Sequence, residues 1–339
     1  MDVFTHGLLG ATLVQCGFQK TLGRKAILWG ALAAILPDID VLVEVFAGPL
    51  AGFKYHRWIT HSLWFGPLIG SGLGYLFWCL KGRRQSLSLW ISLFILTLMS
   101  HSLLDLLTSS GIQLFAPFSD RRCSLDIISI IDLHFTGPLI FSVIMGFFLK
   151  KHQNFVQIIS IVAFGISCTY LIYATNLHRQ SIVQAQQAWK QQHSFDSYIS
   201  LRSLPTLLQP YVRHLLIRYQ DQNCVGTHRA PEFLKEVQWQ CRTQLPNSCA
   251  KRLIDTPIGQ RFAWFSDHNY VAEILNDNLI RFHDLRFTVP GQPFQGLWGL
   301  EGRCLPQLQL SYFRHKLTFS WQRLKMLNVY WKDKDHNEK

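Results

Sequence analysis

The stretch LSLWISLFILTLMSHSLLDLL covers residues 87–107 and stays apolar until His101 and Asp105. About 20 mostly apolar residues in one helix cross the hydrocarbon core of a bilayer, so this stretch predicts a transmembrane helix. His101 and Asp105 are four residues apart and therefore share one face of that helix. Ionisable side chains are costly at membrane depth and usually serve a function, so the end of this helix also predicts a site.

Five other stretches among the first 177 residues have a similar composition, the first of them being shorter than the rest. We therefore expect a mainly α fold that begins with a polytopic transmembrane bundle of about five or six helices over residues 1–177. One stretch contains closely spaced glycines, which predict tight helix packing there. The stretches are residues 3–18, 26–46, 58–80, 127–149 and 156–177, and the glycines are Gly66, Gly70, Gly72 and Gly74.

Basic residues gather in three of the connections between these helices: between the first and second, the third and fourth, and the fifth and sixth. The positive-inside rule predicts that all three connections face the cytoplasm, so both ends of the chain face outward. Most of the ionisable residues within the helices then fall at the outer side, at one depth. The basic residues concerned are Lys20, Arg24, Lys25, Lys81, Arg83, Arg84, Lys150 and Lys151.

The second half of the chain has a different character. Residues 178–195 are Gln-rich and predict a helical linker, residues 196–331 a small α+β or β-rich soluble domain outside the cytoplasm, and residues 332–339 a charged tail. Residues 261–265 and 279–282 alternate at strand period. If this domain is outside the cytoplasm, its four cysteines allow two disulfides in three possible connectivities, and four singly buried reduced thiols are the alternative. The cysteines are Cys224, Cys241, Cys249 and Cys304.

The whole-chain composition excludes several classes of protein. With 48% hydrophobic residues the chain is neither disordered nor collagen-like, and its 339 residues are too many for a small disulfide scaffold. A net charge of +12 by itself is typical of proteins that bind nucleic acids. However, the basic residues form no single stripe or arm and no nucleic-acid signature, so we expect no nucleic-acid partner.

The few acidic residues of the membrane half lie in recurrent pairings with histidine. Of 8 acidic residues among the first 177, only Glu44 and Asp120 fall outside the predicted outer layer. Mixed His/Asp sets suit Zn²⁺ best, with Mn²⁺ or Fe²⁺ as alternatives, and the number of groups allows one or two ions. Taken singly, His101 and Asp105 could instead be a structural hydrogen-bonded pair. The carboxylates of Asp38 and Asp40 could be a helix N-cap or a proton relay, and His56 and His61 could be interfacial residues. The predicted metal ligands are His6, Asp38, Asp40, His56, His61, His101 and Asp105.

Other residues nearby suggest catalytic and substrate-binding roles. The guanidinium of Arg57 could hold a phosphate or carboxylate oxygen by its two-pronged donor geometry. An aspartate outside the metal site, Asp126 or Asp132, could serve as a general base. Thr60 and Ser62 place two hydroxyls beside His61, where they could contact substrate.

These motifs, in this order, resemble the YdjM-type family of inner-membrane proteins, described as metal-dependent hydrolases and as LexA-regulated or LexA-binding. The resemblance rests on DVFTH at residues 2–6, LPDID at 36–40, HR and THS at 56–62 and HSLLD at 101–105. It extends to residues 117–132 and to RFAWFS and DLRF in the outer domain. The family is distantly similar to zinc phospholipase C and P1-type nucleases, which implies a phosphoester substrate and a location in the bacterial inner membrane.

Two classes of function remain open at this stage. The first is a membrane-bound metal-dependent hydrolase of a phosphoester or other ester, acting on a small-molecule or lipid substrate, with metal-activated water as the nucleophile. The second is non-enzymatic: ion or metal handling, or a metal that staples the fold. The inner halves of the helices carry few polar groups, which argues against a transport path.

Overall fold

The computed structural model describes residues 1–193, 197–230, 237–276, 278–289, 291–304 and 308–314, and the predicted tail at 332–339 lies outside this set. Its contacts divide the chain into two compact units. The first unit contains residues 1–187 together with 203–214 and 228–230. The second contains the other described residues, so the division follows no single cut in the sequence.

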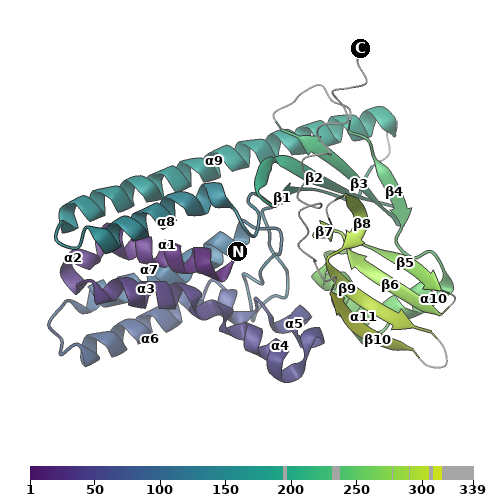
Figure 1. Cartoon of the computed structure of the whole chain (residues 1–339). Coiled ribbons are helices and arrows are strands. Elements are labelled where there is room, and N and C mark those ends of the chain that lie inside the picture. The colour runs from purple at the N-terminus through teal and green to yellow at the C-terminus, as the bar shows by residue number, and fades with distance from the viewer. Residues whose placement is uncertain (194–196, 231–236, 277, 290, 305–307, 315–339) are drawn as a thin grey trace, which may run out of the picture. The chain divides into compact units, whose positions relative to one another are not determined.

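The first unit is helical, and each of the six predicted stretches contains a helix. Figure 1 shows the long helices lying side by side. The long helices are α1 (Val3–Gly17), α3 (Lys25–Ile35), α6 (Phe65–Leu80), α7 (Leu87–Leu106), α8 (Leu133–Phe148) and α9 (Gln153–Gln192). The short helices are α2 (Gln19–Leu22), η1 (Leu36–Val41), α4 (Leu42–Ala47), α5 (Pro49–Tyr55) and η2 (Ile59–His61).

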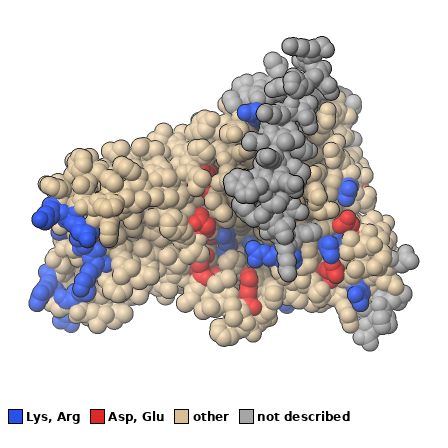
Figure 2. All heavy atoms as spheres, in the orientation of Figure 1, with Lys and Arg blue, Asp and Glu red and all other residues tan. Residues whose placement is uncertain are grey.

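Within the described residues, three helices are long and apolar enough to cross a membrane: Lys25–Ala47, Leu87–Leu106 and Gln153–Gln192. A fourth is reached if the pair Pro49–His61 and Phe65–Leu80, bent by 60°, counts as one span. Helix α8 is apolar but shorter. Membrane helices are thus present, whereas the expected five or six spans are not confirmed. In Figure 2, Lys and Arg gather at one end of the bundle, beside a broad surface without charge.

Glycine sets the close approach of α6 to α7. A Cβ added at Gly74 would lie 2.5 Å from Cα of Ile91, and one at Gly70 would lie 2.8 Å from the backbone nitrogen of Ile95. Gly66 is similarly close to Met99, but a Cβ at Gly72 would meet nothing within 4 Å. The packing role predicted for these glycines therefore holds for three of them, and Gly72 lies away from the interface.

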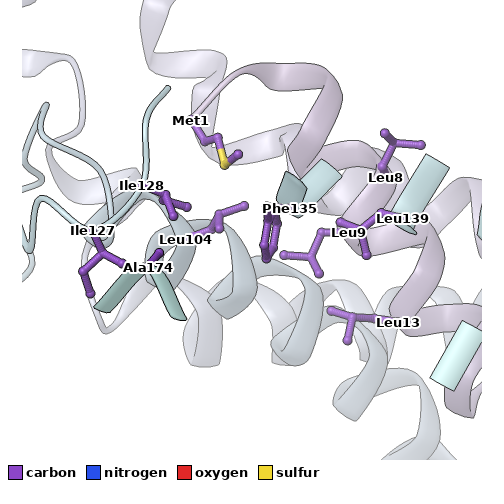
Figure 3. Packing of buried hydrophobic residues seen from close by; sticks show 10 residues of the cluster. All are labelled: Met1, Leu8, Leu9, Leu13, Leu104, Ile127, Ile128, Phe135, Leu139 and Ala174. Carbon is purple, nitrogen blue, oxygen red and sulfur yellow. The ribbon is translucent and has the colours of Figure 1, made fainter. Parts of the chain in front are cut away.

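A buried apolar cluster joins α1, α7, α8 and α9 (Figure 3). Because α1 is almost entirely buried, it is a central helix of the unit. Beside the cluster, the carboxamide oxygen of Gln15 accepts hydrogen bonds from Ser142 (3.0 Å) and Ser160 (3.2 Å), which ties α1 to α8 and α9. The residues of the cluster are Met1, Leu8, Leu9, Leu13, Leu104, Ile127, Ile128, Phe135, Leu139 and Ala174.

The rest of the chain is β-rich, as expected. One sheet has the order β1-β2-β3-β4 and another the order β10-β9-β6-β5, with antiparallel pairing of β3 to β4 and throughout the second sheet; β7 and β8 form a small ribbon. The strands are β1 (Ser200–Thr206), β2 (Gln209–Tyr219), β3 (Gln222–Arg229), β4 (Gln240–Thr243), β5 (Tyr270–Asn276), β6 (Leu279–Asp284), β7 (Thr288–Val289), β8 (Gln292–Gly296), β9 (Trp298–Arg303) and β10 (Gln309–Arg314).

Two helices, α10 (Ser248–Ile254) and α11 (Pro257–Phe265), separate β4 from β5. Helix α11 corrects the strand predicted over residues 261–265. Thr256 caps the helix by accepting from the backbone N–H of Gly259, and Pro257 occupies its first turn, as is typical of helix starts. Gly259 and Phe262 are buried at helical spacing, so the alternation of apolar residues was a short-range coincidence.

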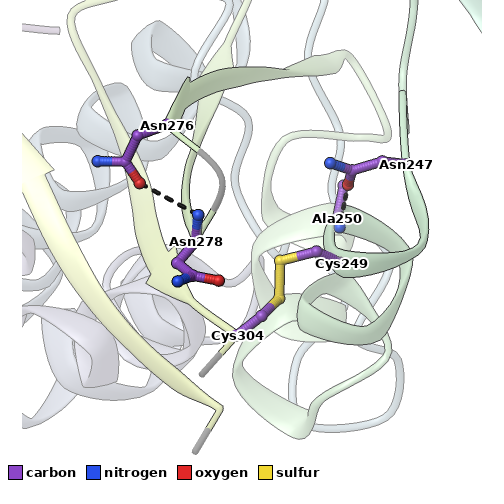
Figure 4. The surroundings of a disulfide bond; sticks show 6 residues. All are labelled: Asn247, Cys249, Ala250, Asn276, Asn278 and Cys304. Atoms are coloured by element: carbon purple, nitrogen blue, oxygen red, sulfur yellow. Dashed lines mark hydrogen bonds between the residues drawn. A yellow bond between two sulfur atoms is a disulfide. The ribbon is translucent and has the colours of Figure 1, made fainter. Parts of the chain in front are cut away.

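The four cysteines of this region form two disulfides. Cys224 on β3 is bonded to Cys241 on β4, and Cys249 on α10 to Cys304 after β9. Figure 4 shows the second bond beside the start of α10, where the side chain of Asn247 accepts from the backbone of Ala250. Of the two alternatives left open by the sequence, the structure has the oxidised one.

Candidate metal centre

Four side chains bring one ligand atom each to a common point. Asp38 comes from η1, His61 from η2, and His101 and Asp105 from one face of α7. Nε2 of His101 lies 3.0 Å from Nε2 of His61 and 3.5 Å from Oδ1 of Asp38. A tetrahedral zinc ion with its usual bond lengths separates neighbouring ligand atoms by roughly 3.4 Å. The cluster therefore has the dimensions of a metal site.

The imidazole of His101 is oriented by the end of another helix. Its Nδ1–H donates to the carbonyl oxygen of Ala34 at 2.6 Å. That carbonyl belongs to the last turn of α3, where carbonyls lack a partner within the helix. Since Nδ1 holds the proton, Nε2 carries a free lone pair toward the cluster. This acceptor could not be identified from the sequence, although Pro37, just beyond it, is typical of a helix end.

His61 is oriented in the same way by a carboxylate. Its Nδ1 lies 3.2 Å from Oδ2 of Asp40 and 3.0 Å from Oγ1 of Thr60. Thr60 gives its own proton to Asp40 at 2.6 Å, so the His61 Nδ1–H acts as the donor. Histidines that bind metal commonly donate their other ring N–H to a carboxylate or a carbonyl. Asp40 thus lies behind His61, and its predicted direct ligation stays a prediction.

The two Nε2 atoms face each other with their lone pairs. Such an approach at 3.0 Å is unfavourable unless a cation lies between the atoms. Oδ2 of Asp105 lies 3.3 Å from Nε2 of His61 and 3.2 Å from Nε of Arg57, without hydrogen-bond geometry toward a described residue. Oδ2 of Asp38 is buried and also makes no hydrogen bond to a described residue. Buried polar atoms are normally satisfied, so both carboxylates fit a bound metal ion.

Asp105 also contacts groups on its second oxygen. Oδ1 lies 3.2 Å from Nε2 of His6 and accepts from the amino nitrogen of Met1. The His6 ring stacks on that of His101, with centroids 3.7 Å apart, and its Nδ1 is buried without a hydrogen bond to the described chain. The structure therefore brings His6 to the cluster edge, in contact with one ligand and stacked on another.

Negative charge predominates around the centre. Nε of Arg57 lies 3.2 Å from Oδ2 of Asp105, and the backbone N–H of Arg57 donates to Asp40 at 2.8 Å. Among the described side chains in these contacts, Arg57 is the permanently charged cation, against the carboxylates of Asp38, Asp40 and Asp105. A divalent cation offsets the remaining negative charge, which is costly when buried.

The remaining residues of the 56–62 motif have other partners. Nδ1 of His56 lies 2.8 Å from Oδ1 of Asp40, so His56 contacts the carboxylate that orients His61. The hydroxyl of Ser62 donates to the carbonyl of Ile59 and stabilises η2. Ligation by His56 and substrate contacts by Thr60 and Ser62 stay predictions.

Asp126 and Asp132 lie on the segment that leads into α8. The carboxylate of Asp132 caps α8, accepting from His134 and Phe135, and also accepts from the hydroxyl of Tyr170 at 2.6 Å. Asp126 is buried with a left-handed backbone (φ 55°), and its carbonyl accepts from Arg213. Both aspartates therefore have evident structural roles, and the general-base role stays a prediction.

Comparisons with known proteins point in one direction. The family model of the YdjM inner membrane protein matches residues 1–178, which contain the whole cluster. The chain is also similar to inner membrane protein YbcI of Escherichia coli (strain K12), with 33% identity over 125 residues, covering 35% of this chain and 69% of that protein. No solved structure matches the chain.

Proposed function

The chain belongs to the YdjM family of inner membrane proteins, and from this premise and the site geometry we propose that it is a membrane-bound, metal-dependent hydrolase of a phosphoester or other ester. One observation carries the proposal: two imidazoles and two carboxylates converge, and the imidazoles are already held in the tautomer that metal binding requires. Metal sites with a purely structural role use cysteine thiolates as ligands far more often than such a His/Asp set.

The protein residues would prepare the reaction in three ways. Asp38, His61, His101 and Asp105 would hold a divalent transition metal ion, for which Zn²⁺ is our first choice. A metal ion in this position supplies a Lewis acid and lowers the pKa of water toward neutrality. Arg57, buried beside Asp105, would bind an anionic oxygen of the substrate. Asp40 would keep His61 oriented while the charges rearrange.

We further infer that the centre faces the extracytoplasmic side. Supporting this orientation, Lys and Arg gather at one end of the bundle in Figure 2, and the connections predicted to be cytoplasmic supply basic residues. The two disulfides in the β-rich part also favour an oxidising compartment.

The test begins with metal analysis of the detergent-purified protein. We expect about one transition-metal ion per chain, or two if His6 completes a second position, and at most a trace in the His101→Ala protein. The wild type should hydrolyse chromogenic phosphodiesters and carboxylic esters in a metal-dependent way. Absence of metal, together with no response to added Zn²⁺ or Mn²⁺, would contradict the proposal.

Burial of the centre favours one alternative, a structural metal. His61, His101 and Asp105 are fully buried and tie η2 and α7 to η1, as a staple would. In that case His101→Ala would lower thermal stability, and no substrate would be turned over by the metal-loaded wild type. Under the proposed function, the metal-loaded wild type turns over ester, and Arg57→Lys retains metal while losing activity.

A further inference from the structure

The metal cluster lies below the outer boundary of the predicted membrane region, in its outer half. Asp38 is 13 residues after Lys25 along α3 and η1, and His101 is 14 residues after Leu87 along α7. At the helical rise, both paths are about 20 Å long. In the predicted topology α3 and α7 begin at the cytoplasmic boundary of the hydrocarbon core, which is about 30 Å thick. The metal cluster would therefore lie about 10 Å below the outer boundary of the core.

Exposed apolar side chains alternate with the ligands at this depth. Ile39 lies between Asp38 and Asp40, and Leu103 lies between His101 and Asp105, and both are exposed. Ile59, two residues before His61, is exposed as well. Ile39 and Ile59 thus form an apolar wall beside the ligand-bearing segments η1 and η2, whereas Leu103 lies on the face of α7 opposite its ligands. An exposed apolar surface suits acyl chains and not water.

Helix α4 continues this apolar wall. It has no buried residue, and Val45 and Phe46 are 72% and 85% exposed. Helix α5 follows and ends in an amphipathic group, in which the Lys54 ammonium lies 5.3 Å from the ring centroid of Tyr55 and the Tyr55 ring contacts Trp58. Lysine, tyrosine and tryptophan are typical of the membrane–water interface, so α4 and α5 lead from that interface into the bilayer.

Access to the centre is on this same side. Among its ligands only Asp38 is partly exposed, at 13% of its side chain, and His56 behind Asp40 is 27% exposed. Asp38 and Ile39 are neighbours on η1, which runs directly into α4. A molecule that reaches the cluster at Asp38 therefore passes the apolar residues of η1 and α4.

Building on the proposed function, we propose that the substrate is a membrane lipid whose headgroup is attached through a phosphoester or ester bond. The lipid enters from the outer leaflet past Val45 and Phe46 of α4, and its ester reaches Asp38. Its acyl chains then run deeper along α3, over the exposed side chains of Ile39, Leu32 and Leu28. Hydrolysis breaks the bond to the leaving oxygen, which receives a proton from water while the water oxygen takes its place. No oxidant or reductant is needed.

A contact experiment tests the lipid path without any activity measurement. The protein is placed in nanodiscs of phosphatidylethanolamine and phosphatidylglycerol that contain a phosphatidylethanolamine with a diazirine close to its glycerol. We expect photoadducts on residues 39–46, reduced at least fivefold in Val45→Ser/Phe46→Ser. The matched control, Ile161→Ser/Val162→Ser, changes two exposed residues of α9 and should leave these adducts unchanged. Adducts on α9 but none on residues 39–46 would overturn the proposal.

An activity experiment separates this proposal from the proposed function. Val45→Ser/Phe46→Ser should lower kcat/KM for a nanodisc phospholipid about tenfold and leave hydrolysis of soluble bis(p-nitrophenyl) phosphate unchanged. Equal losses on both substrates would overturn the lipid path. A wild type that hydrolyses only the soluble ester overturns the lipid assignment and leaves the proposed function standing. Hydrolysis of neither substrate overturns both.

Discussion

At the residue scale, the centre depends on where the imidazole protons lie. His101 gives its Nδ1–H to the carbonyl of Ala34, and His61 gives its own to the pair Asp40 and Thr60. These hydrogen bonds keep the Nε2 atom of each imidazole unprotonated before any ion binds, so metal binding requires no rearrangement of hydrogen bonds. The free energy of binding is then not reduced by a reorganisation cost, which is the advantage of a preorganised site.

Asp40 allows this idea to be tested without removing a ligand of the four-residue cluster. Asp40→Asn keeps the size of the side chain but removes the charge that orients and polarises His61, and second-layer changes of this kind lower metal affinity about 10–100-fold. We expect that loss in competition titrations with a chromogenic chelator, with unchanged metal content at saturation. A lower stoichiometry would instead identify Asp40 as a direct ligand, as the sequence suggested.

Arg213 has an anchoring role that sequence reasoning did not identify. It is fully buried, and its guanidinium donates to the carbonyls of Asp126, Ile127 (3.1 Å) and Ser203 (2.7 Å). Burial lowers the pKa of Arg213 to about 10, opposed by Asp126 and Tyr170, so the side chain stays cationic at neutral pH. It therefore fixes the segment that leads into α8.

Replacing this anchor should destabilise the helical unit. Arg213→Met leaves several buried carbonyls without a donor, each such group costing about 1–3 kcal/mol. We expect a clear fall in Tm by differential scanning fluorimetry in detergent. Arg179→Met, at an exposed position of α9, is the control and should stay within about 0.5 kcal/mol of the wild type. Equal Tm values for the two variants would argue against the anchor.

At the element scale, the contact of α6 with α7 depends on residues that have no side chain. Gly74→Val would place a Cβ 2.5 Å from the Ile91 backbone, which cannot move without shifting α7 and its two ligands. Such overpacking typically costs about 1–3 kcal/mol. We expect both lower thermal stability and weaker metal binding. Gly72→Val introduces the same side chain on the same helix where nothing lies within 4 Å, and should change neither property.

The elements show what could be predicted from sequence and what could not. Long apolar stretches and the spacing of His101 and Asp105 have local causes, and both predictions were confirmed as a helix and as two members of one cluster. Residues 261–265 were predicted as a strand because apolar residues alternate there, but they form part of helix α11. The helix cap at Thr256 was a stronger signal than an alternation over five residues. The Ala34 acceptor could not be predicted, because its partner His101 is 67 residues away and only packing of α3 on α7 joins them.

Two sequence motifs of the β-rich part, residues 261–266 and 284–287, contact each other in the structure. The guanidinium of Arg286 pairs with Asp284 at 2.7 Å and lies over the ring of Phe265, at the end of α11. The resemblance noted for residues 261–266 and 284–287 thus concerns segments that contact each other. A buried ion pair of this kind serves the packing of the fold.

At the scale of the whole molecule, the disulfides connect stability with cell compartment. Cys249 and Cys304 are 55 residues apart, and their bond restricts the unfolded chain strongly. We expect Cys249→Ser/Cys304→Ser to lower the free energy of unfolding of the β-rich part by about 2–4 kcal/mol, measured by limited proteolysis in denaturant. The control Cys168→Ser removes a thiol without a bond and should have little effect. If both variants resist protease equally, the bond has no stabilising role.

The orientation can be tested independently with single added cysteines, in a background lacking the four free thiols. The turn before α7 lies at the basic end of the bundle by sequence, whereas Asn278 is an exposed residue of the β5–β6 turn. Lys and Arg near helix ends keep a connection on the cytoplasmic side because translocating them is unfavourable. Gln85→Cys should therefore react with a membrane-impermeant maleimide only after the cells are permeabilised, and Asn278→Cys already in intact cells. The reverse pattern would place the metal centre on the cytoplasmic side, and the lipid would then have to enter from the inner leaflet.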